Sequence, residues 1–406
     1  MRSEDITGMG TLAIHGTHGS MPEYAHLAPI FASSTFTFDS AEQGMERFSG
    51  KEKGYTYSRF GNPTTTMAEE LIAALEGFNI SDENGQPLKL KALLHSSGQA
   101  AMATMFMSNL SAGDTILSNN SLYGGTFEFL NGFITRFGVR SSFINMRDLD
   151  LLEHSIRKDP SIKLLHLETP ANPTMQCIDI EAICKIAKRY DLKCTVDNTF
   201  ATPYLQQPFK YGADFIFHST TKFLNGHGTS IGGVLIGRDI EFMNTKGYTT
   251  YKLLGGNSNA FDAFLLIQGI KTLSIRMEKH CSNANAVALF LSKHSSVEQV
   301  HYNGLKSHPD YSISVKQMKD HGAVLSFELK GGFDNAKKFI DKLNVCTRAV
   351  SVGTIDTLVS HPASMSHSGM SKHDRYKSGI TDGLIRMSVG LEDLNDILSD
   401  LDQALQ

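Results

Sequence analysis

Short apolar segments alternate with stretches of helical periodicity between about residues 64 and 240. Each apolar segment is bounded by Gly, Asp or Ser, and helical patterns such as 64–75, 99–110 and 180–190 separate several of them. Such alternation predicts a largely parallel sheet that helices cover on both faces. The predicted strands are 92–95, 115–117, 142–144, 164–167, 195–196, 215–217 and 233–236.

The pattern changes after a glycine-rich stretch that ends at Asn257. One long helical pattern runs from Ala260 to about His294, and strand patterns return near residues 323–329 and 384–389. A smaller α+β domain is therefore expected after the α/β domain.

Residues 1–63 lack a strong period and contain three prolines, which favours an extended arm. The chain has 406 residues, which is longer than a single hydrophobic core usually supports. We therefore expect an N-terminal arm over 1–63, a large domain over 64–257 and a C-terminal domain over 258–406.

The composition is ordinary for a globular enzyme, with 41% hydrophobic and 20% charged residues. A net charge of −4, without long blocks of like charge, predicts neither a nucleic-acid nor a membrane partner. The five cysteines contain no Cys-x-x-Cys pair, as expected of reduced thiols in the cytoplasm. No apolar run approaches the roughly 20 residues of a membrane span, and no metal-binding motif is present.

Lys222 follows a predicted strand directly after Ser219, Thr220 and Thr221, and Asp197 ends another strand upstream. Pyridoxal phosphate (PLP) requires an amine for a Schiff base, hydroxyls for its phosphate and a carboxylate for its protonated pyridine nitrogen. Both residues fall at carboxyl ends of strands, where parallel sheets carry their functional groups. This arrangement predicts a PLP enzyme that acts on an amino acid.

The segment Ser96-Ser97-Gly98-Gln99 leaves a predicted strand and enters a helix. Its glycine lets the backbone approach a phosphate, and the helix N-terminus favours an anion. The same residues also suit a plain helix cap. Beside the Ser-Thr-Thr-Lys run, we expect them to form the second half of a phosphate site.

Tyr123 precedes two glycines, so it could stack on the pyridine ring or be a simple turn tyrosine. Arg386 lies in an apolar, strand-like run, where a guanidinium needs an anion. That anion is either a protein carboxylate or, as the other groups favour, a substrate carboxylate. Tyr57 and Arg59 form a basic aromatic cluster on the arm, which alone is typical of a surface loop.

The chain resembles the Cys/Met-metabolism PLP-dependent enzymes, which include methionine γ-lyase, cystathionine γ-lyase, cystathionine γ-synthase and O-acetylhomoserine sulfhydrylase. The similarity runs from Ala28-Pro29-Ile30 through segments 57–63, 168–173 and 196–199 to His361-Pro-Ala-Ser364. It implies the aspartate-aminotransferase-like (type I) PLP fold and a homotetramer of two tight dimers.

The resemblance also implies roles for individual residues. Lys222 would hold the cofactor and carry protons, Asp197 would pair with the pyridine nitrogen, and Tyr123 would stack on the ring and assist the leaving group. The phosphate would be bound by Gly98, Gln99, Ser219 and Thr221, joined by Tyr57 and Arg59 of the neighbouring subunit. The substrate carboxylate would be bound by Arg386, Asn172 and Ser351.

The resemblance favours a lyase that cleaves at the γ-carbon of a sulfur amino acid, with methionine as the substrate. Segments 349–353 and 362–365 are most similar to methionine γ-lyases. The alternative is a γ-replacement enzyme, such as O-acetylhomoserine sulfhydrylase or cystathionine γ-synthase. It is favoured by Gly125, where methionine γ-lyases typically have a reactive cysteine, and by Gln99, which replaces their usual methionine. A non-catalytic PLP-binding protein is a remote alternative, because every expected site group is present.

Overall fold

The larger of two β-sheets has seven strands in the order β1-β7-β6-β5-β4-β2-β3. The computed structural model describes residues 6–17, 22–366, 368, 371–377 and 379–406. Neighbouring strands are parallel except at β7, which is antiparallel to both β1 and β6. The predicted, mostly parallel sheet is confirmed with all seven predicted strands. Their bounds are β1 (Lys91–His95), β2 (Thr115–Asn119), β3 (Arg140–Ile144), β4 (Ile162–Glu168), β5 (Lys193–Asp197), β6 (Phe215–His218) and β7 (Gly233–Gly237).

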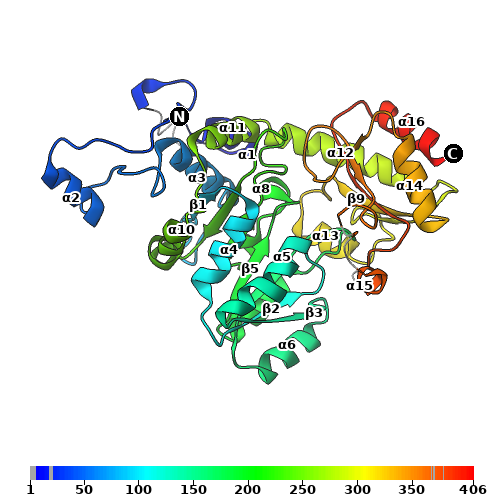
Figure 1. The fold of residues 1–406 in the computed structure, drawn as a ribbon, viewed down its shortest axis with the longest axis horizontal. Helices are drawn as coiled ribbons and strands as arrows, with labels where there is room; N and C mark the ends of the chain where they lie inside the picture. The colour runs from blue at the N-terminus through cyan, green and yellow to red at the C-terminus, as the bar shows by residue number, and fades with distance from the viewer. Residues whose placement is uncertain (1–5, 18–21, 367, 369–370, 378) are drawn as a thin grey trace.

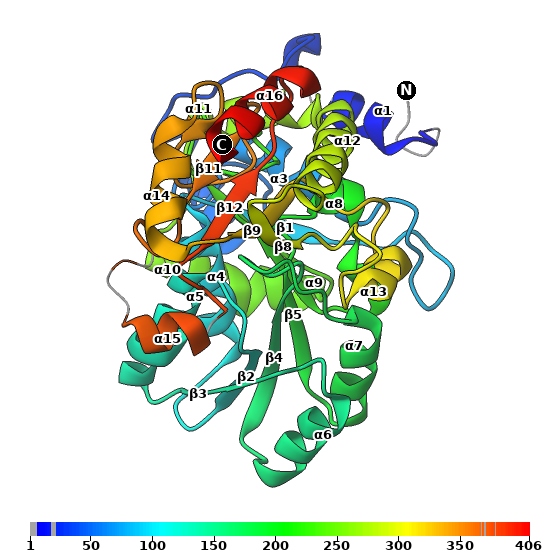
Figure 2. The same cartoon turned by 90° about the vertical axis from the view of Figure 1, so that its right-hand side faces the viewer.

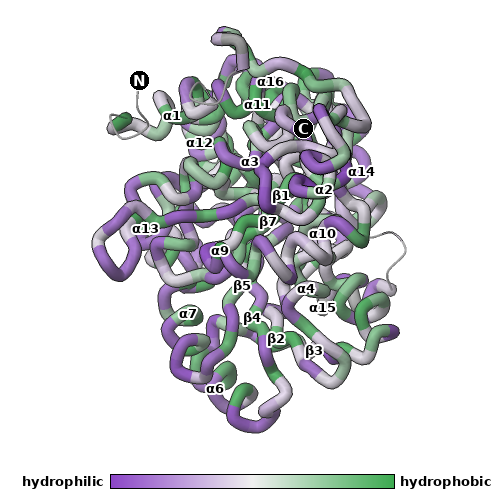
Figure 3. Tube along the Cα trace, turned by 90° about the vertical axis from the view of Figure 1, so that its left-hand side faces the viewer, coloured by the Kyte–Doolittle hydropathy of each residue, from purple (hydrophilic) through white to green (hydrophobic). Residues whose placement is uncertain are grey.

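Helices cover both faces of this sheet (Figure 2). The helices are α3 (Pro63–Glu76), α4 (Gly98–Asn109), α5 (Gly124–Glu128), α6 (Leu149–Lys158) and α7 (Ile180–Arg189). Successive side chains of a strand point to opposite faces. Leu235 therefore joins the core under α4, whereas Val234 and Ile236 join the core under α3. In Figure 3 the interior around β4 and β7 is largely hydrophobic.

The smaller sheet has five strands in the order β10-β11-β12-β9-β8. Helices α14 (Gly332–Lys342) and α16 (Leu394–Leu405) share a hydrophobic core with it. An α+β region therefore follows the larger sheet, as the strand patterns predict. The strand bounds are β8 (Val297–His301), β9 (Val324–Leu329), β10 (Thr347–Arg348), β11 (Leu358–Ser360) and β12 (Leu384–Ser388).

The single long helix expected over 260–294 is two helices, α11 (Ala260–Ile270) and α12 (Leu273–Leu291). The break is stabilised by Arg276, whose guanidinium donates to the Gly269 carbonyl (2.8 Å) and to Thr272 Oγ1 (3.0 Å). Helix α12 then runs from the larger domain, beside α11, to the region of the smaller sheet (Figure 1). Its first half packs in the core of the larger sheet and its second half in that of the smaller sheet.

The N-terminal segment contains two helices that its weak periodicity does not indicate. Helix α1 (Met9–His15) buries Leu12 and Ala13 in the core that also contains residues of α3 and α12. Helix α2 (Ala41–Ser49) projects away from the body of the chain (Figure 1). The remaining α-helices are α8 (Thr202–Leu205), α9 (Ile240–Phe242), α10 (Tyr248–Leu254), α13 (Tyr311–Gln317) and α15 (Lys372–Lys377).

Candidate active site

Two carboxyl groups lie side by side where β4 and β5 end. Glu168 and Asp197 are direct partners in the parallel register, and we call them the acidic pair. Burial, followed by the charge of Asp197, raises the pKa of Glu168 to about 8. Burial also raises the pKa of Asp197. Across the described ranges neither carboxyl forms an ion pair, so the acidic pair suits a cationic group such as a protonated ring nitrogen.

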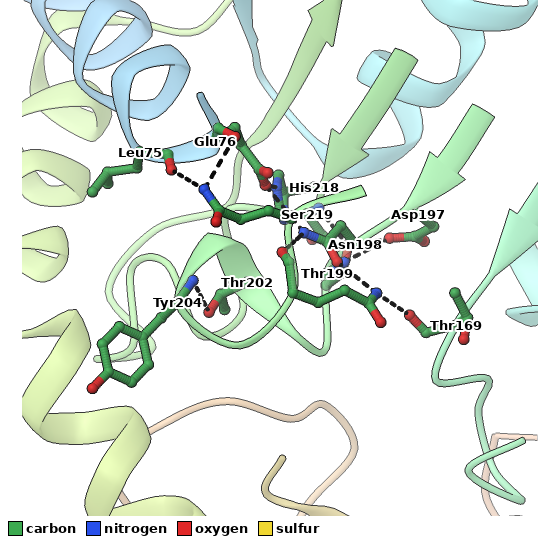
Figure 4. A network of polar contacts seen from close by, with 12 residues as sticks. Leu75, Glu76, Thr169, Asp197, Asn198, Thr199, Thr202, Tyr204, His218 and Ser219 are labelled. Atoms are coloured by element: carbon green, nitrogen blue, oxygen red, sulfur yellow. Dashed lines mark hydrogen bonds and ion pairs between the residues drawn. The ribbon is translucent and has the colours of Figure 1, made fainter. Parts of the chain in front are cut away.

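Thr199 fixes the orientation of Asp197. Its backbone N–H donates to Asp197 Oδ1 at 3.0 Å, and its hydroxyl donates to the same oxygen. The hydroxyl oxygen also accepts from the backbone N–H of Ser219 at 2.9 Å, as Figure 4 lets the reader follow. One side chain therefore ties the end of β5 to the start of the loop that carries Lys222.

A second pair, Lys222 and Arg386, has the opposite charge, and we call it the basic pair. Lys222 Nζ donates to Ser351 Oγ at 2.6 Å, while Arg386, on β12, donates to the Ser351 carbonyl at 3.0 Å. Burial, and then the charge of Arg386, lowers the pKa of Lys222 to about 8. Burial lowers the pKa of Arg386 to about 10.

The partners of Arg386 bear on its two predicted roles. Its guanidinium donates to the neutral Asn172 Oδ1 (3.4 Å) and to the Ser351 carbonyl. No described carboxylate lies within ion-pair distance of it. A half-buried guanidinium with only neutral partners is suited to an anion from outside the chain.

Ser351 has a left-handed backbone, with φ of 104°, which is unusual for a residue other than glycine. Such a conformation costs about 1–3 kcal/mol and persists only where surrounding contacts hold it. Here the hydroxyl contacts Lys222 and the carbonyl contacts Arg386. Ser351 therefore joins the lysine loop to the smaller sheet.

Glu168 is a site residue that the sequence analysis missed. Its Oε2 accepts the backbone N–H of Tyr123 at 2.6 Å, and its Oε1 accepts that of Asn172 at 3.1 Å. A single buried carboxyl thus holds the candidate stacking residue and a neighbour of Arg386. Its place at the end of the strand beside Asp197 was the signal available in the sequence.

Arg276 was also missed. Its guanidinium donates to the carbonyls of Phe223 (2.8 Å) and Leu224 (3.4 Å). These are the two residues that follow Lys222, so Arg276 orders the backbone on the far side of the lysine. Nothing in the helical pattern around Arg276 distinguishes this role from a surface position.

The two predicted halves of the phosphate site meet at Gly98 and Ser219. A Cβ at Gly98 would lie 2.8 Å from Ser219 Cβ, so only glycine permits this approach. Helix α4 begins here with Ser97 as its N-cap, and the Thr221 hydroxyl accepts the Gly232 N–H at 3.0 Å. The N-terminal N–H groups and the dipole of α4 favour a bound anion.

The side chain of Gln99, in the first turn of α4, contacts the loop of Tyr123. Its Nε2 donates to the Gly125 carbonyl at 2.9 Å. A Cβ at Gly125 would lie 2.6 Å from Tyr123 Cε1 and 3.1 Å from Gln99 Oε1. Tyr123 is 55% exposed, and its backbone N–H contacts Glu168 of the acidic pair.

Tyr57 and Arg59 are the two predicted residues that the structure does not bring to the others. Arg59 donates to the Lys252 carbonyl at 2.6 Å and lies 4.6 Å from the Phe60 ring centre. Tyr57 is 42% exposed and forms a single β-bridge with Thr35. No contact of the described residues joins either side chain to Lys222, so both lie on a separate part of this chain.

The residues brought together fit PLP. The acidic pair suits its ring nitrogen, the glycine-lined start of α4 suits its phosphate, and a lysine of lowered pKa suits its aldehyde. Within the described part of the chain, no three His, Cys, Asp or Glu side chains gather as a metal site. No helix there combines the length and apolarity that crossing a membrane requires. All five cysteines are buried free thiols.

Comparison with known proteins agrees with this fit. The model of the Cys/Met metabolism PLP-dependent enzyme family matches residues 10–406. The chain is 46% identical to the L-methionine gamma-lyase of Fusobacterium nucleatum subsp. nucleatum, covering 98% of each protein. It is 44% identical to that of Porphyromonas gingivalis, covering 100% of this chain and 99% of the relative. The crystal structure of metB from Corynebacterium glutamicum superposes with a TM-score of 0.90 at 35% identity, covering 100% of this chain and 99% of that one.

Proposed function

Since the chain belongs to the Cys/Met metabolism PLP-dependent enzyme family, we propose that it is a carbon–sulfur lyase acting on L-methionine. The reaction consumes methionine and water and releases methanethiol, 2-oxobutanoate and ammonia. The 46% identity to a methionine gamma-lyase over nearly the whole chain supports this choice of substrate.

The observation that carries the proposal is the arrangement around Ser351. Its hydroxyl holds the Lys222 amine, and its carbonyl holds a guanidinium that has no carboxylate partner among the described residues. An amino acid whose carboxylate binds Arg386 would therefore place its α-carbon near the lysine amine. This is the geometry that proton removal from an α-carbon requires.

PLP, when bound, supplies an electron sink for the charge that develops as the substrate loses protons. Asp197, which Thr199 holds in place, would keep the proton on the ring nitrogen. Lys222 Nζ would hold the cofactor through its aldehyde carbon and would move the α- and β-protons of the substrate. The Tyr123 hydroxyl donates a proton to the departing sulfur, and Arg386 with Asn172 orients the substrate carboxylate.

A γ-replacement enzyme is the second candidate, and the observation that favours it is the contact between Gln99 and Gly125. The Tyr123 ring and the Gln99 amide fill the space that a side chain at position 125 would need, so this chain has no thiol beside the tyrosine that would face the leaving group. Methionine γ-lyases typically have a reactive cysteine at this position, and its absence favours a replacement reaction.

One assay separates the two functions. Purified, PLP-loaded protein is incubated with L-methionine alone, and with O-acetylhomoserine in the presence or absence of sulfide. We expect methanethiol and 2-oxobutanoate from methionine alone. Homocysteine formed only from ester plus sulfide, with methionine inert, would instead identify the replacement enzyme.

We further propose that the enzyme is a cytoplasmic homotetramer whose active sites are shared across a dimer interface. Tyr57 and Arg59 lie on the arm, apart from Lys222 of their own chain, which supports a role in a neighbour's phosphate site. Two inactive variants, Lys222→Ala and Arg59→Ala, should regain activity when refolded together, because mixed dimers contain one intact site. Two variants that stay inactive after confirmed subunit mixing would contradict shared sites.

A further inference from the structure

A buried glutamate–histidine pair lies behind the candidate cofactor site. His218 ends β6 and Glu76 ends α3, and His218 Nε2 lies 2.5 Å from Glu76 Oε1. Both side chains are fully buried, at 0% exposure. The residues are 142 positions apart in the sequence, so only the fold brings them together. Burying a carboxylate is costly unless a cation or hydrogen bonds compensate it.

This pair is connected to Asp197 through the neighbouring strand. Asn198, which follows Asp197, donates from Nδ2 to Glu76 Oε1 at 3.1 Å and to the Gln206 carbonyl at 2.9 Å (Figure 4). The Asn198 N–H donates to the Phe217 carbonyl, next to His218. His218 Nδ1 is buried and has no hydrogen-bond partner within the described structure, so this imidazole is held by Glu76 alone.

The charges around Asp197 are unequal on its two sides. Glu168 lies beside it on β4, and two adjacent carboxyls cannot both ionise at low cost. Burial raises the pKa of Asp197, but the hydrogen bonds of Thr199 and the charge of His218 act in the opposite direction. Glu168 has no such cation, and its pKa is raised further by Asp197. The surroundings therefore favour the ionised form more strongly at Asp197 than at Glu168.

We propose that Glu76 and His218 are positioning residues that keep Asp197 ionised, so that it can bind a protonated pyridine ring. The proposal rests on the assignment of PLP as the cofactor, and it does not depend on which amino acid is the substrate. Glu76 holds the imidazole as a cation, the imidazolium stabilises the Asp197 carboxylate, and the carboxylate holds the proton on the ring nitrogen. Opposite charges thus alternate from the end of α3 to the cofactor.

The test compares two cofactors on the same protein. Glu76→Gln keeps an oxygen for His218 but removes the charge. Equilibrium dissociation constants are measured, at constant pH, for PLP and for its analogue in which carbon replaces the ring nitrogen. We expect Glu76→Gln to weaken PLP binding at least about tenfold and to change binding of the carbon analogue by less than about twofold, because only PLP presents a ring N–H to Asp197.

Equal weakening for both cofactors would mean that the pair is only structural, and no weakening for either would also overturn the proposal. His218→Asn removes the cation from the other side of the pair and must show the same selectivity, which covers poor folding of the first variant. His166→Asn is the matched control. His166 is equally buried in the same sheet but contacts the hydroxyl of Thr195 and no carboxylate, so this substitution should not discriminate between the cofactors. If the wild-type protein itself did not bind PLP, the assignment of PLP as the cofactor would be refuted instead.

Discussion

The acidic pair and the basic pair of the site are compensated in different ways. The acidic pair has the buried His218–Glu76 pair behind it and two backbone N–H donors on Glu168. The basic pair has only neutral contacts, from Ser351 and Asn172. Burial disfavours the charged form of each group, so it raises the pKa of the two acids and lowers the pKa of the two bases. The acidic pair is therefore stabilised by the protein itself, whereas the basic pair depends on the anions that it binds.

The largest effect is expected from removing the lysine of the basic pair. Lys222→Ala should lower turnover of methionine at least about 1,000-fold, because no other described amine contacts Ser351. It should also remove the visible absorption of lysine-bound cofactor. Lys271→Ala is the control, since Lys271 is a half-buried lysine whose pKa is also lowered by burial. A Lys222→Ala protein that keeps both properties would contradict the assignment.

Replacing Arg386, the second member of the basic pair, tests whether the anion that it binds is the substrate carboxylate. Arg386→Ala should raise KM for methionine about 100-fold, the effect of losing charge-assisted hydrogen bonds to a carboxylate. Arg386→Lys should recover part of this loss, since it restores the charge without the planar fork. An unchanged KM in both variants would show that Arg386 serves the fold and not the substrate.

The acidic pair should respond more weakly, through hydrogen bonds. In Glu168→Gln the amide nitrogen cannot accept, so the N–H of Tyr123 or of Asn172 loses its acceptor. An unsatisfied buried donor costs about 1–3 kcal/mol, which predicts a loss of about tenfold in kcat/KM. Steady-state kinetics beside Glu153→Gln, a change on α6 where Glu153 pairs with Arg189 of α7, measure this effect. Equal kinetics for the two variants would exclude a positioning role for Glu168.

The smallest effect concerns pH. The Lys222 pKa is lowered to about 8, so the neutral amine prevails above that pH and apo-protein should take up PLP faster as pH rises through it. Arg386 disfavours the ammonium, so Arg386→Ala should move this midpoint to higher pH, whereas Arg386→Lys should leave it in place. Rates of cofactor attachment from pH 6.5 to 9.5 measure the midpoint, and a shift to lower pH contradicts the coupling.

Much of the scaffold is predictable from local patterns. Each strand of the larger sheet shows as a short apolar segment, and Lys222 and Asp197 stand where such segments end. Local patterns fail where a contact joins distant residues. Glu76 and His218 look like ordinary residues until α3 and β6 meet, and Arg276 breaks a continuous helical period by binding the carbonyl of Gly269.

The left-handed backbone of Ser351 is a second feature that local sequence patterns do not predict. Serine has no propensity for this conformation. It occurs together with contacts to Lys222 and Arg386, which lie far from Ser351 in the sequence, so the local sequence does not predict it. Likewise, the arm shows no period, yet α1 packs firmly because Leu12 and Ala13 meet a core built by later residues.

The contact between Gln99 and Gly125 restricts how this protein can change. A side chain at position 125 would meet the Tyr123 ring at 2.6 Å and the Gln99 amide at 3.1 Å, so the ring must shift, and a smaller residue at position 99 would relieve the rest of the clash. The two positions are therefore expected to be epistatic, with most single substitutions at 125 harmful in the present background. A mutant library that varies residues 99 and 125 together should contain active enzymes that two successive single-site searches would miss.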